Sequence, residues 1–455
     1  MLDIAVKKCC APLLNILFGG ADMLLFDAGL VKDTLFSTID SLLENRDDTL
    51  TNPQSDFTRT RKISFTQAVL FPMVAGSDNV ATELLDLFGE KRLPMPSAMI
   101  QRRSQIRPEA FRKLFHLFTG KFAPRNLYYG YQLVACDGSR INLPYNPSDA
   151  DTFICAIKGR KGINQVHLNS LYDVLNDIFL DIELQGIHQM NEKAAFCSLL
   201  KKQLSSGRKQ IFIADRGYAS YNIFANAVHN GQLFLIRVPE SFAREMCPAD
   251  THWMERNHED REISVHIGHR RTKELRQLEN YHYISARGHY DFINAGSDDV
   301  DHLRLRVLKF PISEDSYEYI VTNLPKYGFS DRMIKELYSL RWNCETAYRH
   351  LKYAGNVVHI HSLKKDFLLQ EIYGKLTMYN FSSFLGAAAE RVQKKTDHYT
   401  YVLNHTQVQK ICNRYLKGRI ENVTDLISRF LVPVRPGRKF ERKLRRQSAD
   451  TLNYR

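Results

Sequence analysis

The stretch YYGYQLVACDGSRINL (residues 128–143) is rich in aromatic and apolar residues and turns polar at Asp137. This pattern predicts a β-strand that ends in a turn. Two further strand patterns follow, over residues 166–174 and 177–186, and they are separated by turn-forming residues. The centre of the chain therefore opens with three successive strands.

Beyond these strands, helical and strand patterns alternate. Apolar residues at helical spacing predict helices, and compact apolar runs predict strands. In order, we expect a helix over 191–204, a strand over 209–215, a helix over 221–230 and a strand over 232–238. Three strands followed by alternating helices and strands indicate an α/β fold, in which a mixed sheet is covered by helices.

The regions on either side of this unit differ from it in composition. Residues 239–322 carry many charged and aromatic residues and strand-like stretches such as REISVHIG, which predicts a β-rich insertion. The residues before the core and at the end of the chain have helical patterns, and the chain ends in a basic tail. We expect five parts: a helical N-terminal region, a first part of the core, the insertion, a second part of the core and a helical C-terminal region (1–125, 126–238, 239–322, 323–390 and 391–455).

The composition is that of a folded, basic protein. Apolar residues make up 44% of the chain and charged residues 25%, with a net charge of +13 and a pI near 9.2. Such a surplus favours a polyanionic partner, because Lys and Arg gain affinity by releasing counterions from phosphates. The alternative is an enzyme that is basic for another reason.

The cysteines and the N-terminus indicate a cytoplasmic location. The eight cysteines form no CxxC pair, so neither a zinc ribbon nor a thioredoxin-like site is indicated, and free thiols fit a reducing cytosol. The apolar run over residues 9–26 is interrupted by Asp22 and is too short to span a membrane. We expect this run to be a buried helix and expect no membrane partner.

The N-terminal region contains a candidate DNA-recognition helix. Residues 97–106, SAMIQRRSQI, predict a helix that exposes Arg102 and Arg103, and two apolar helical patterns over 64–74 and 79–88 precede it. Two short helices followed by an arginine-bearing one are compatible with a helix-turn-helix module. The alternative is a solvated basic face.

Residues 330–352, SDRMIKELYSLRWNCETAYRHLK, predict a long helix with a polar stripe. The stripe consists of Tyr338, Arg341, Glu345 and Lys352, whose spacing places all four side chains on one face. A carboxylate there can bind a metal ion, while the cations and the phenol hold phosphate oxygens. The alternative is an exposed, salt-bridged face.

The spacing Y-x2-R-x3-E-x6-K resembles the signature of the insertion sequence 4 family of bacterial DDE transposases, whose third catalytic carboxylate is this glutamate. Two earlier segments, VACDGSR (134–140) and FIADRGY (212–218), resemble the first and second aspartate motifs of that family, in the same order. The resemblance covers about residues 60–390.

This resemblance implies an RNase H-like core with Asp137, Asp215 and Glu345 as the catalytic residues. The three carboxylates would hold two Mg²⁺ ions, for which Mn²⁺ can substitute, because two hard cations need oxygen ligands that bridge and neutralise them. It further implies an enzyme that binds terminal inverted repeats, cuts the DNA and joins it to target DNA, working as a homodimer in a synaptic complex at the bacterial nucleoid.

Two alternatives keep the same DNA-binding character. One is an RNase H-like nuclease that cuts without joining. The other is a transposase-derived regulator that binds DNA without catalysis, although a pure binder has no need of three carboxylates that repel phosphate.

The resemblance also implies DNA contacts around the carboxylates. Tyr338, Arg341 and Lys352 would hold phosphates of the transposon end, and Arg216 and Tyr218 would add contacts beside the second aspartate.

Some relatives carry a tryptophan before a TNLP-like segment, and this tryptophan stacks on a flipped base during hairpin formation. Here Tyr317 and Tyr319 precede the segment TNLP (322–325). An aromatic ring can stack on a base, so both are candidates for this role. The departure from tryptophan leaves open whether a hairpin forms.

Overall fold

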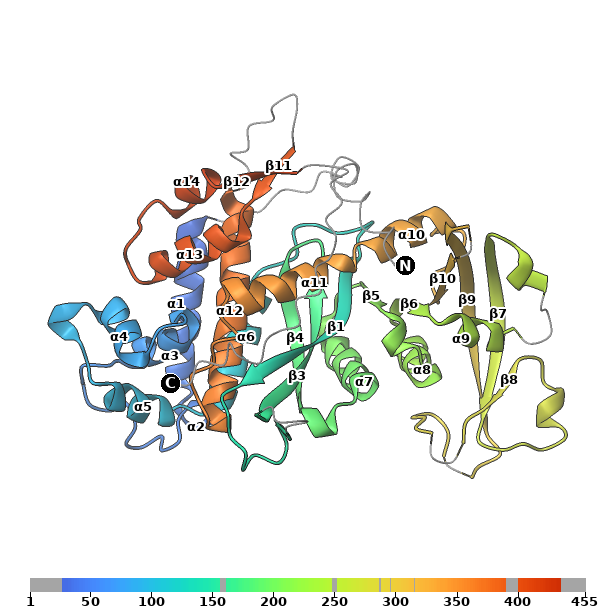
Figure 1. Ribbon diagram of the computed structural model, residues 1–455, viewed down its shortest axis with the longest axis horizontal. Helices are drawn as coiled ribbons and strands as arrows, with labels where there is room; N and C mark the ends of the chain where they lie inside the picture. Colours follow the sequence, from blue (N-terminus) through green and yellow to red (C-terminus); the bar gives the residue numbers. More distant parts are fainter. Residues whose placement is uncertain are drawn as a thin grey trace.

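The molecule has a helical part, an α/β core and a strand-rich part, from left to right in Figure 1. The predicted N-terminal buried helix and the basic C-terminal tail lie outside the residues that the computed structural model describes. The described residues are 27–155, 161–247, 252–285, 288–294, 296–314, 316–389 and 400–434.

A mixed β-sheet forms the centre. Its core strands are β1 (Gln132–Leu143), β3 (Ile163–Asp173), β4 (Ile178–Gly186), β5 (Gln210–Ala214) and β6 (Leu233–Val238). Strands β1, β3 and β4 form an antiparallel meander, and β5 and β6 are added on the other side of β1 and run parallel to it. The short β2 (Phe153–Ile154) pairs with the start of β3. This order is that of an RNase H-like core, so the predicted α/β fold class is confirmed.

Helices cover both faces of the core sheet. The two that matter for the site are α7 (Glu192–Gln203) and α11 (Trp342–Arg349). On β3, His167 contacts Glu192 of α7, whereas Ser170 contacts Tyr348 of α11. Because residues three apart on a strand point to opposite faces, α7 and α11 lie on opposite faces of the sheet.

The predicted insertion extends the core sheet sideways instead of forming a separate layer. Its elements are α9 (Glu240–Glu245), β7 (Glu259–Gly268), β8 (Tyr281–Tyr283), β9 (Val300–Ser313) and β10 (Ser316–Thr322). Strand β10 pairs with β6, and β9 and β7 follow, so one ten-stranded sheet runs through the molecule (Figure 1). Helix α8 (Tyr221–His229) connects β5 to β6.

The N-terminal helices are α1 (Ala28–Glu44), α2 (Arg46–Thr49), α3 (Phe65–Val74), α4 (Val80–Phe88), α5 (Pro96–Ser104) and α6 (Pro108–Gly120). Helices α1, α3 and α6 pack against α12 (Lys365–Ala389), which is buried along most of its length, and an ion pair joins α5 to it. Asn380 of α12 accepts a hydrogen bond from the backbone N–H of Phe179 (2.9 Å) and donates one to its carbonyl (2.8 Å). This pair of bonds joins the helical part to β4.

The C-terminal region, predicted as helical, also contains a small sheet. Strands β11 (Thr400–Leu403) and β12 (Leu431–Val434) pair antiparallel around helices α13 (His405–Leu416) and α14 (Val423–Ser428). No helix in the described parts of the chain is both long and apolar enough to cross a membrane.

Candidate active site

Asp137 and Asp215 lie side by side where the parallel pairing of β1 and β5 ends, on the carboxyl side of both strands. In the register of β1 and β5, Cys136 pairs with Ala214; Asp137 is the next residue of β1, and Asp215 is the first residue after β5. The predicted turn at Asp137 is wrong: β1 continues through it to Leu143, because its partner β3 continues as well. Only the parallel pairing ends here, which leaves both carboxylates at the same level.

Each aspartate is fixed by a backbone N–H beside it. Asp137 Oδ1 accepts a hydrogen bond from the N–H of Gly138 (2.8 Å), and Asp215 Oδ1 accepts one from the N–H of Arg216 (2.6 Å). Asp215 thereby caps the short 3-10 turn that follows β5. These bonds hold the side chains against the chain ends and leave the remaining oxygens available.

Glu345 comes from the predicted helix, which is interrupted. The segment consists of α10 (Asp331–Ser339), α11 and a π-helical turn (His350–Ala354). Between α10 and α11, the N–H of Arg341 bonds to the carbonyl of Tyr338 (3.1 Å), a tighter spacing than that of an α-helix. The predicted continuous helix is therefore broken next to the arginine of the motif.

Tyr348 connects α11 to β1 and was missed by the sequence reasoning. Its hydroxyl donates to the carbonyl oxygen of Asp137 (2.7 Å) and lies 2.7 Å from Ser170 Oγ. It stands three residues after Glu345, so the helix is attached to the backbone of the first aspartate one turn from the glutamate.

Arg341 lies between the carboxylates. Its guanidinium is 3.2 Å from Glu345 Oε1 and 3.8 Å from Asp137 Oδ2, and its side chain is only 2% exposed. The Tyr338 hydroxyl donates to Asp215 Oδ1 over 3.4 Å. Tyr338 is 3% exposed. Both side chains thus point to the carboxylates, and the phosphate contacts expected of them stay predictions.

The electrostatics reflect this crowding of acids. Burial raises the pKa of Asp137 to about 6, against the charge of Arg341 and the bond from Gly138, and the neighbouring Glu345 and Asp215 raise it further. Burial opposes the charge of Arg341, yet the surrounding phenol and carboxylates hold its pKa above the ordinary value. One guanidinium therefore faces a surplus of negative charge.

The donor set suits a hard divalent ion, because Asp137, Asp215 and Glu345 supply carboxylate oxygens and already attract one cation. Across the described residues, however, no three His, Cys, Asp or Glu side chains are grouped tightly enough to hold a single ion as they stand. An ion held by all three carboxylates would therefore require them to lie closer together, whereas one or two carboxylates with water or phosphate oxygens can hold such an ion.

Around this centre, the cations differ in exposure. Arg216 is exposed directly beside Asp215, and Lys352 is half-buried in the π-helical turn. Tyr218 is 2% exposed and packs against Phe196, with ring centroids 5.3 Å apart, and its contact with DNA stays a prediction.

The predicted exposure of Arg102 and Arg103 is also wrong. They are 8% and 4% exposed. Arg102 donates to the carbonyl of Ile63 (3.1 Å), and Arg103 forms an ion pair with Glu371 of α12 (3.2 Å). The face of α5 that carries them is a packing face, and a recognition helix cannot use it.

The two base-stacking candidates differ in accessibility. Tyr319 is 3% exposed and packs edge-on against Trp253, so its ring is not available to a base. Tyr317 is partly exposed, with Lys309 Nζ 3.8 Å from its ring centroid. Between them, Glu318 lies 3.5 Å from Arg237, and this pair was missed by the sequence reasoning.

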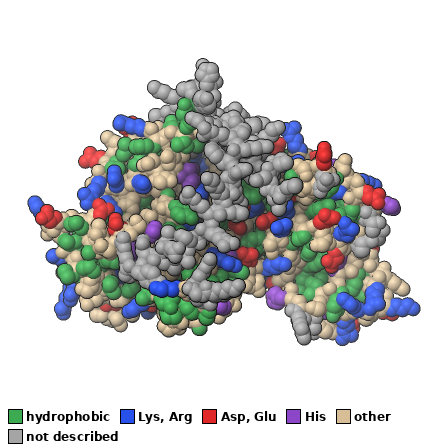
Figure 2. Space-filling model, in the orientation of Figure 1, with side chains coloured by type: hydrophobic (Ala, Val, Ile, Leu, Met, Phe, Trp, Pro, Cys, Tyr) green, Lys and Arg blue, Asp and Glu red, His purple; other side chains and the backbone are tan. Residues whose placement is uncertain are grey.

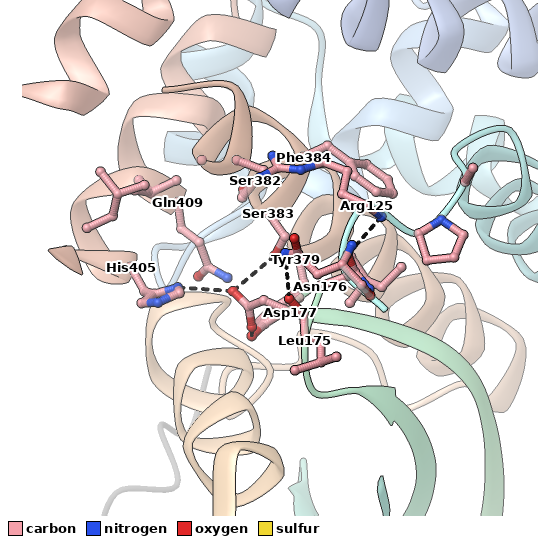
Figure 3. A pocket seen from close by; sticks show the side chains of 18 residues that line it. Arg125, Leu175, Asn176, Asp177, Tyr379, Ser382, Ser383, Phe384, His405 and Gln409 are labelled. Atoms are coloured by element: carbon pink, nitrogen blue, oxygen red, sulfur yellow. Dashed lines mark hydrogen bonds and ion pairs between the residues drawn. The ribbon is translucent and has the colours of Figure 1, made fainter. Parts of the chain in front are cut away.

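The face shown in Figure 2 carries Lys and Arg side chains over both the helical and the strand-rich parts, with acidic side chains among them. A separate pocket of about 100 Å³ lies between the β3–β4 turn, α12 and α13. Its acid, Asp177, is bound by His405, Tyr379 and Ser383 (Figure 3). The carboxylate in that pocket therefore has several hydrogen-bonding partners, whereas Asp137, Asp215 and Glu345 surround a single guanidinium.

Two comparisons with known proteins found matches. The family model described as Transposase DDE domain matches residues 128–381, a range that contains Asp137, Asp215 and Glu345. Among solved structures, the chain is similar to a piggyBac transposase in a synaptic complex with hairpin DNA, with 11% identity and a TM-score of 0.45, over 92% of this chain and 88% of that one. None of the curated proteins matches it. With the family model matching more than half of its length, this chain belongs to the DDE transposase domain family.

Proposed function

We propose that this protein is an insertion-sequence transposase of the insertion sequence 4 family, which cuts DNA at terminal inverted repeats and joins the ends to target DNA. The observation that carries the proposal is the placement of Asp137 and Asp215 at the same level of two parallel strands, with Glu345 and Asp137 both close to Arg341. Membership of the DDE transposase domain family supports it.

Asp137, Asp215 and Glu345 would hold Mg²⁺ or Mn²⁺, and two such ions would activate the attacking water or 3′ hydroxyl and stabilise the leaving oxygen. The chain itself sets where this happens. Tyr348 fixes α11 against the Asp137 peptide, and the N–H groups of Gly138 and Arg216 orient the aspartates. The reaction needs no covalent link between protein and DNA.

The DNA contacts in this proposal follow exposure. Exposed Arg216 and half-buried Lys352 flank the carboxylates and are suited to hold phosphates of the transposon end. Partly exposed Tyr317 remains a candidate for base stacking. Two protomers would bridge two inverted-repeat ends in a synaptic complex, at the nucleoid in the cytoplasm.

The test is a cleavage and joining assay on DNA that carries the inverted repeats flanking the gene, in Mg²⁺, with DNA binding measured in parallel. Wild type should give 3′-hydroxyl ends and joined products, and Glu345→Gln should give neither while it still binds. Glu336→Gln, in the same helical segment and paired with exposed Arg332 (3.1 Å), is the matched control and should keep activity.

Other outcomes favour the alternatives. Cleavage without joined products would indicate a nuclease. Binding by wild type without cleavage in Mg²⁺ or Mn²⁺ would contradict the proposal and favour a DNA-binding regulator.

A further inference from the structure

A buried histidine and a glutamate meet on the face of the sheet opposite the Asp137 side chain. His167 Nε2 of β3 lies 3.0 Å from Glu192 Oε1 in the first turn of α7, and the side chains are 4% and 35% exposed. In the β1–β3 register, Asp137 pairs with Ser170 and Arg140 with His167. His167 therefore belongs to the face of the sheet that does not carry the catalytic carboxylate.

The space for this pair exists because residue 138 has no side chain. A Cβ atom at Gly138 would lie 2.4 Å from His167 Nε2 and 2.9 Å from Glu192 Oε1. The other oxygen of this carboxylate reaches the second motif, since a Cβ atom at Gly217 would lie 3.6 Å from Glu192 Oε2. One carboxylate thus contacts the residue after Asp137 and approaches the turn that begins at Asp215.

Neither glycine is required by its backbone, because neither Gly138 nor Gly217 has a positive φ. Gly138 leaves room for the pair, whereas a Cβ atom at Gly217 would be in ordinary van der Waals contact with Glu192. The first turn of α7 is attached to the second motif as well, since Lys193 Nζ donates to the carbonyl of Ala219 (2.8 Å). The start of α7 therefore spans the distance between the two aspartate segments.

The contact between His167 and Glu192 is short but poorly aligned as a hydrogen bond. The ring nitrogen and the carboxylate are at hydrogen-bond distance, but the two nitrogens of His167 have no well-aligned hydrogen bond in the described part of the chain. The side-chain contact with His167 nevertheless lowers the pKa of Glu192. A pair that fills a fitted space between two catalytic segments is better suited to setting their positions than to adding stability.

We propose that the His167–Glu192 pair is a positioning element that sets the separation of Asp137 and Asp215 from the opposite face of the sheet. This inference rests on the proposed function, because it assumes that the two aspartates bind metal. A glycine follows Asp137 directly because the pair occupies the space where a side chain at residue 138 would lie.

The first experiment is a titration of the full-length protein with Mn²⁺, without DNA, followed by the electron paramagnetic resonance of free Mn²⁺. Gly138→Ala should weaken Mn²⁺ binding by about tenfold or more, as loss of outer supports of metal sites does. His167→Ala alone should weaken Mn²⁺ binding to a similar degree, because it removes the pair and leaves residue 138 unchanged. The double variant Gly138→Ala with His167→Ala should bind no more weakly than either single variant, since both changes act through the same pair. Losses that add in the double variant would show that residue 138 acts on Asp137 independently of the pair and would overturn the proposal.

The second variant, Glu192→Gln, keeps the side-chain shape and serves if Gly138→Ala does not fold. It should weaken Mn²⁺ binding severalfold and leave the melting temperature nearly unchanged. Its matched control is Glu183→Gln on β4, because Glu183 is about as exposed as Glu192 (32% against 35%) and pairs with Lys202 of α7 (2.6 Å). The control should bind Mn²⁺ like wild type.

The results separate the two proposals. If Glu192→Gln binds Mn²⁺ like wild type while Asp137→Asn loses binding, the pair has only a structural role and the positioning proposal is wrong. If Asp137→Asn also binds Mn²⁺ like wild type, the metal site itself is wrong, and the proposed function fails with it.

Discussion

Two buried arginines of this protein face carboxylates in different ways. Arg103, between the N-terminal helices and α12, donates to Glu371 Oε1 (3.2 Å), to Gln370 Oε1 (3.0 Å) and to the carbonyl of Phe367 (3.2 Å). Glu371 also accepts from the N–H of His361 (2.9 Å). Every charge in this cluster has a partner.

Arg341, at the edge of β1 and β5, has fewer hydrogen bonds and more acids around it. Its Nε has no hydrogen-bond partner in the part of the chain that the structure describes. The acids differ accordingly. Burial raises the pKa of Asp137 to about 6, whereas at Glu371 the contacts from His361 and Arg103 outweigh burial and lower the pKa to about 2.

The difference indicates separate roles. A buried charge cluster whose members are all paired connects distant segments, and here it holds α5 to α12. A cluster with surplus negative charge is unstable by itself and gains from further cations. A surplus of negative charge is therefore the pattern expected of a site that binds metal.

The largest effect is expected for Asp137→Asn. Cleavage should fall about 1,000-fold or more, because a metal ligand is lost. The folded pKa lies above the ordinary value, so ionising Asp137 opposes folding, and this cost is complete above pH 6. Without metal at pH 7.5, the variant should therefore be more stable than wild type, by on the order of 2 kcal/mol.

The measurement is thermal unfolding with a chelator present, alongside the cleavage assay. A variant that loses both activity and stability would show that Asp137 supports the fold, as Arg103 does, and would remove the contrast between the clusters.

The opposite result is expected for Arg103→Ala. Breaking a buried ion pair leaves Glu371 charged and without its partner, so the free energy of unfolding should fall by about 3–5 kcal/mol. Chemical denaturation measures this. The matched control is Arg332→Ala, in an exposed pair with Glu336 (3.1 Å), which should change stability by about 0.5 kcal/mol or less. If the free energy of unfolding fell equally in both variants, the buried cluster would contribute no more stability than an exposed ion pair.

Local patterns in the sequence predicted local structure well. The apolar run that ends at Asp215 is a buried strand, and the order of strands and helices in the core follows the chain. Such elements are determined by neighbours in sequence, through the burial of alternate or periodic side chains. The metal and DNA roles of the site residues stay predictions.

What was mispredicted depends on distant partners. The helix that carries Arg103 was predicted correctly. The direction in which the Arg103 side chain points was not, because its hydrogen-bond partner Gln370 lies 267 residues away in the sequence. The contact of Tyr348 with Asp137 spans 211 residues. A single sequence contains no signal for such pairs, since a buried arginine and an exposed one have the same local pattern.

The smallest predicted effect concerns pH and separates the clusters in one experiment. Protonation of Asp137 competes with metal, so Mn²⁺ affinity without DNA should fall as the pH drops through about 6, by up to tenfold for each unit below it. The Arg103 cluster should be intact in that range. The pKa of Glu371 is lowered, so its contribution is present above about pH 4.5 and is lost only as the pH falls towards 2.

His361 points the same way. Its pKa is raised, mainly by its contact with Glu371, so its contribution is complete below its ordinary pKa of 6.5 and is lost as the pH rises above it. At pH 5 the protein should therefore remain folded and bind Mn²⁺ more weakly than at pH 7.5, which circular dichroism and Mn²⁺ titration on the same samples would show. If Mn²⁺ affinity and the folded fraction decline together, the weaker binding at low pH would reflect unfolding. The surplus negative charge around Arg341 would then not distinguish this cluster from the Arg103 cluster.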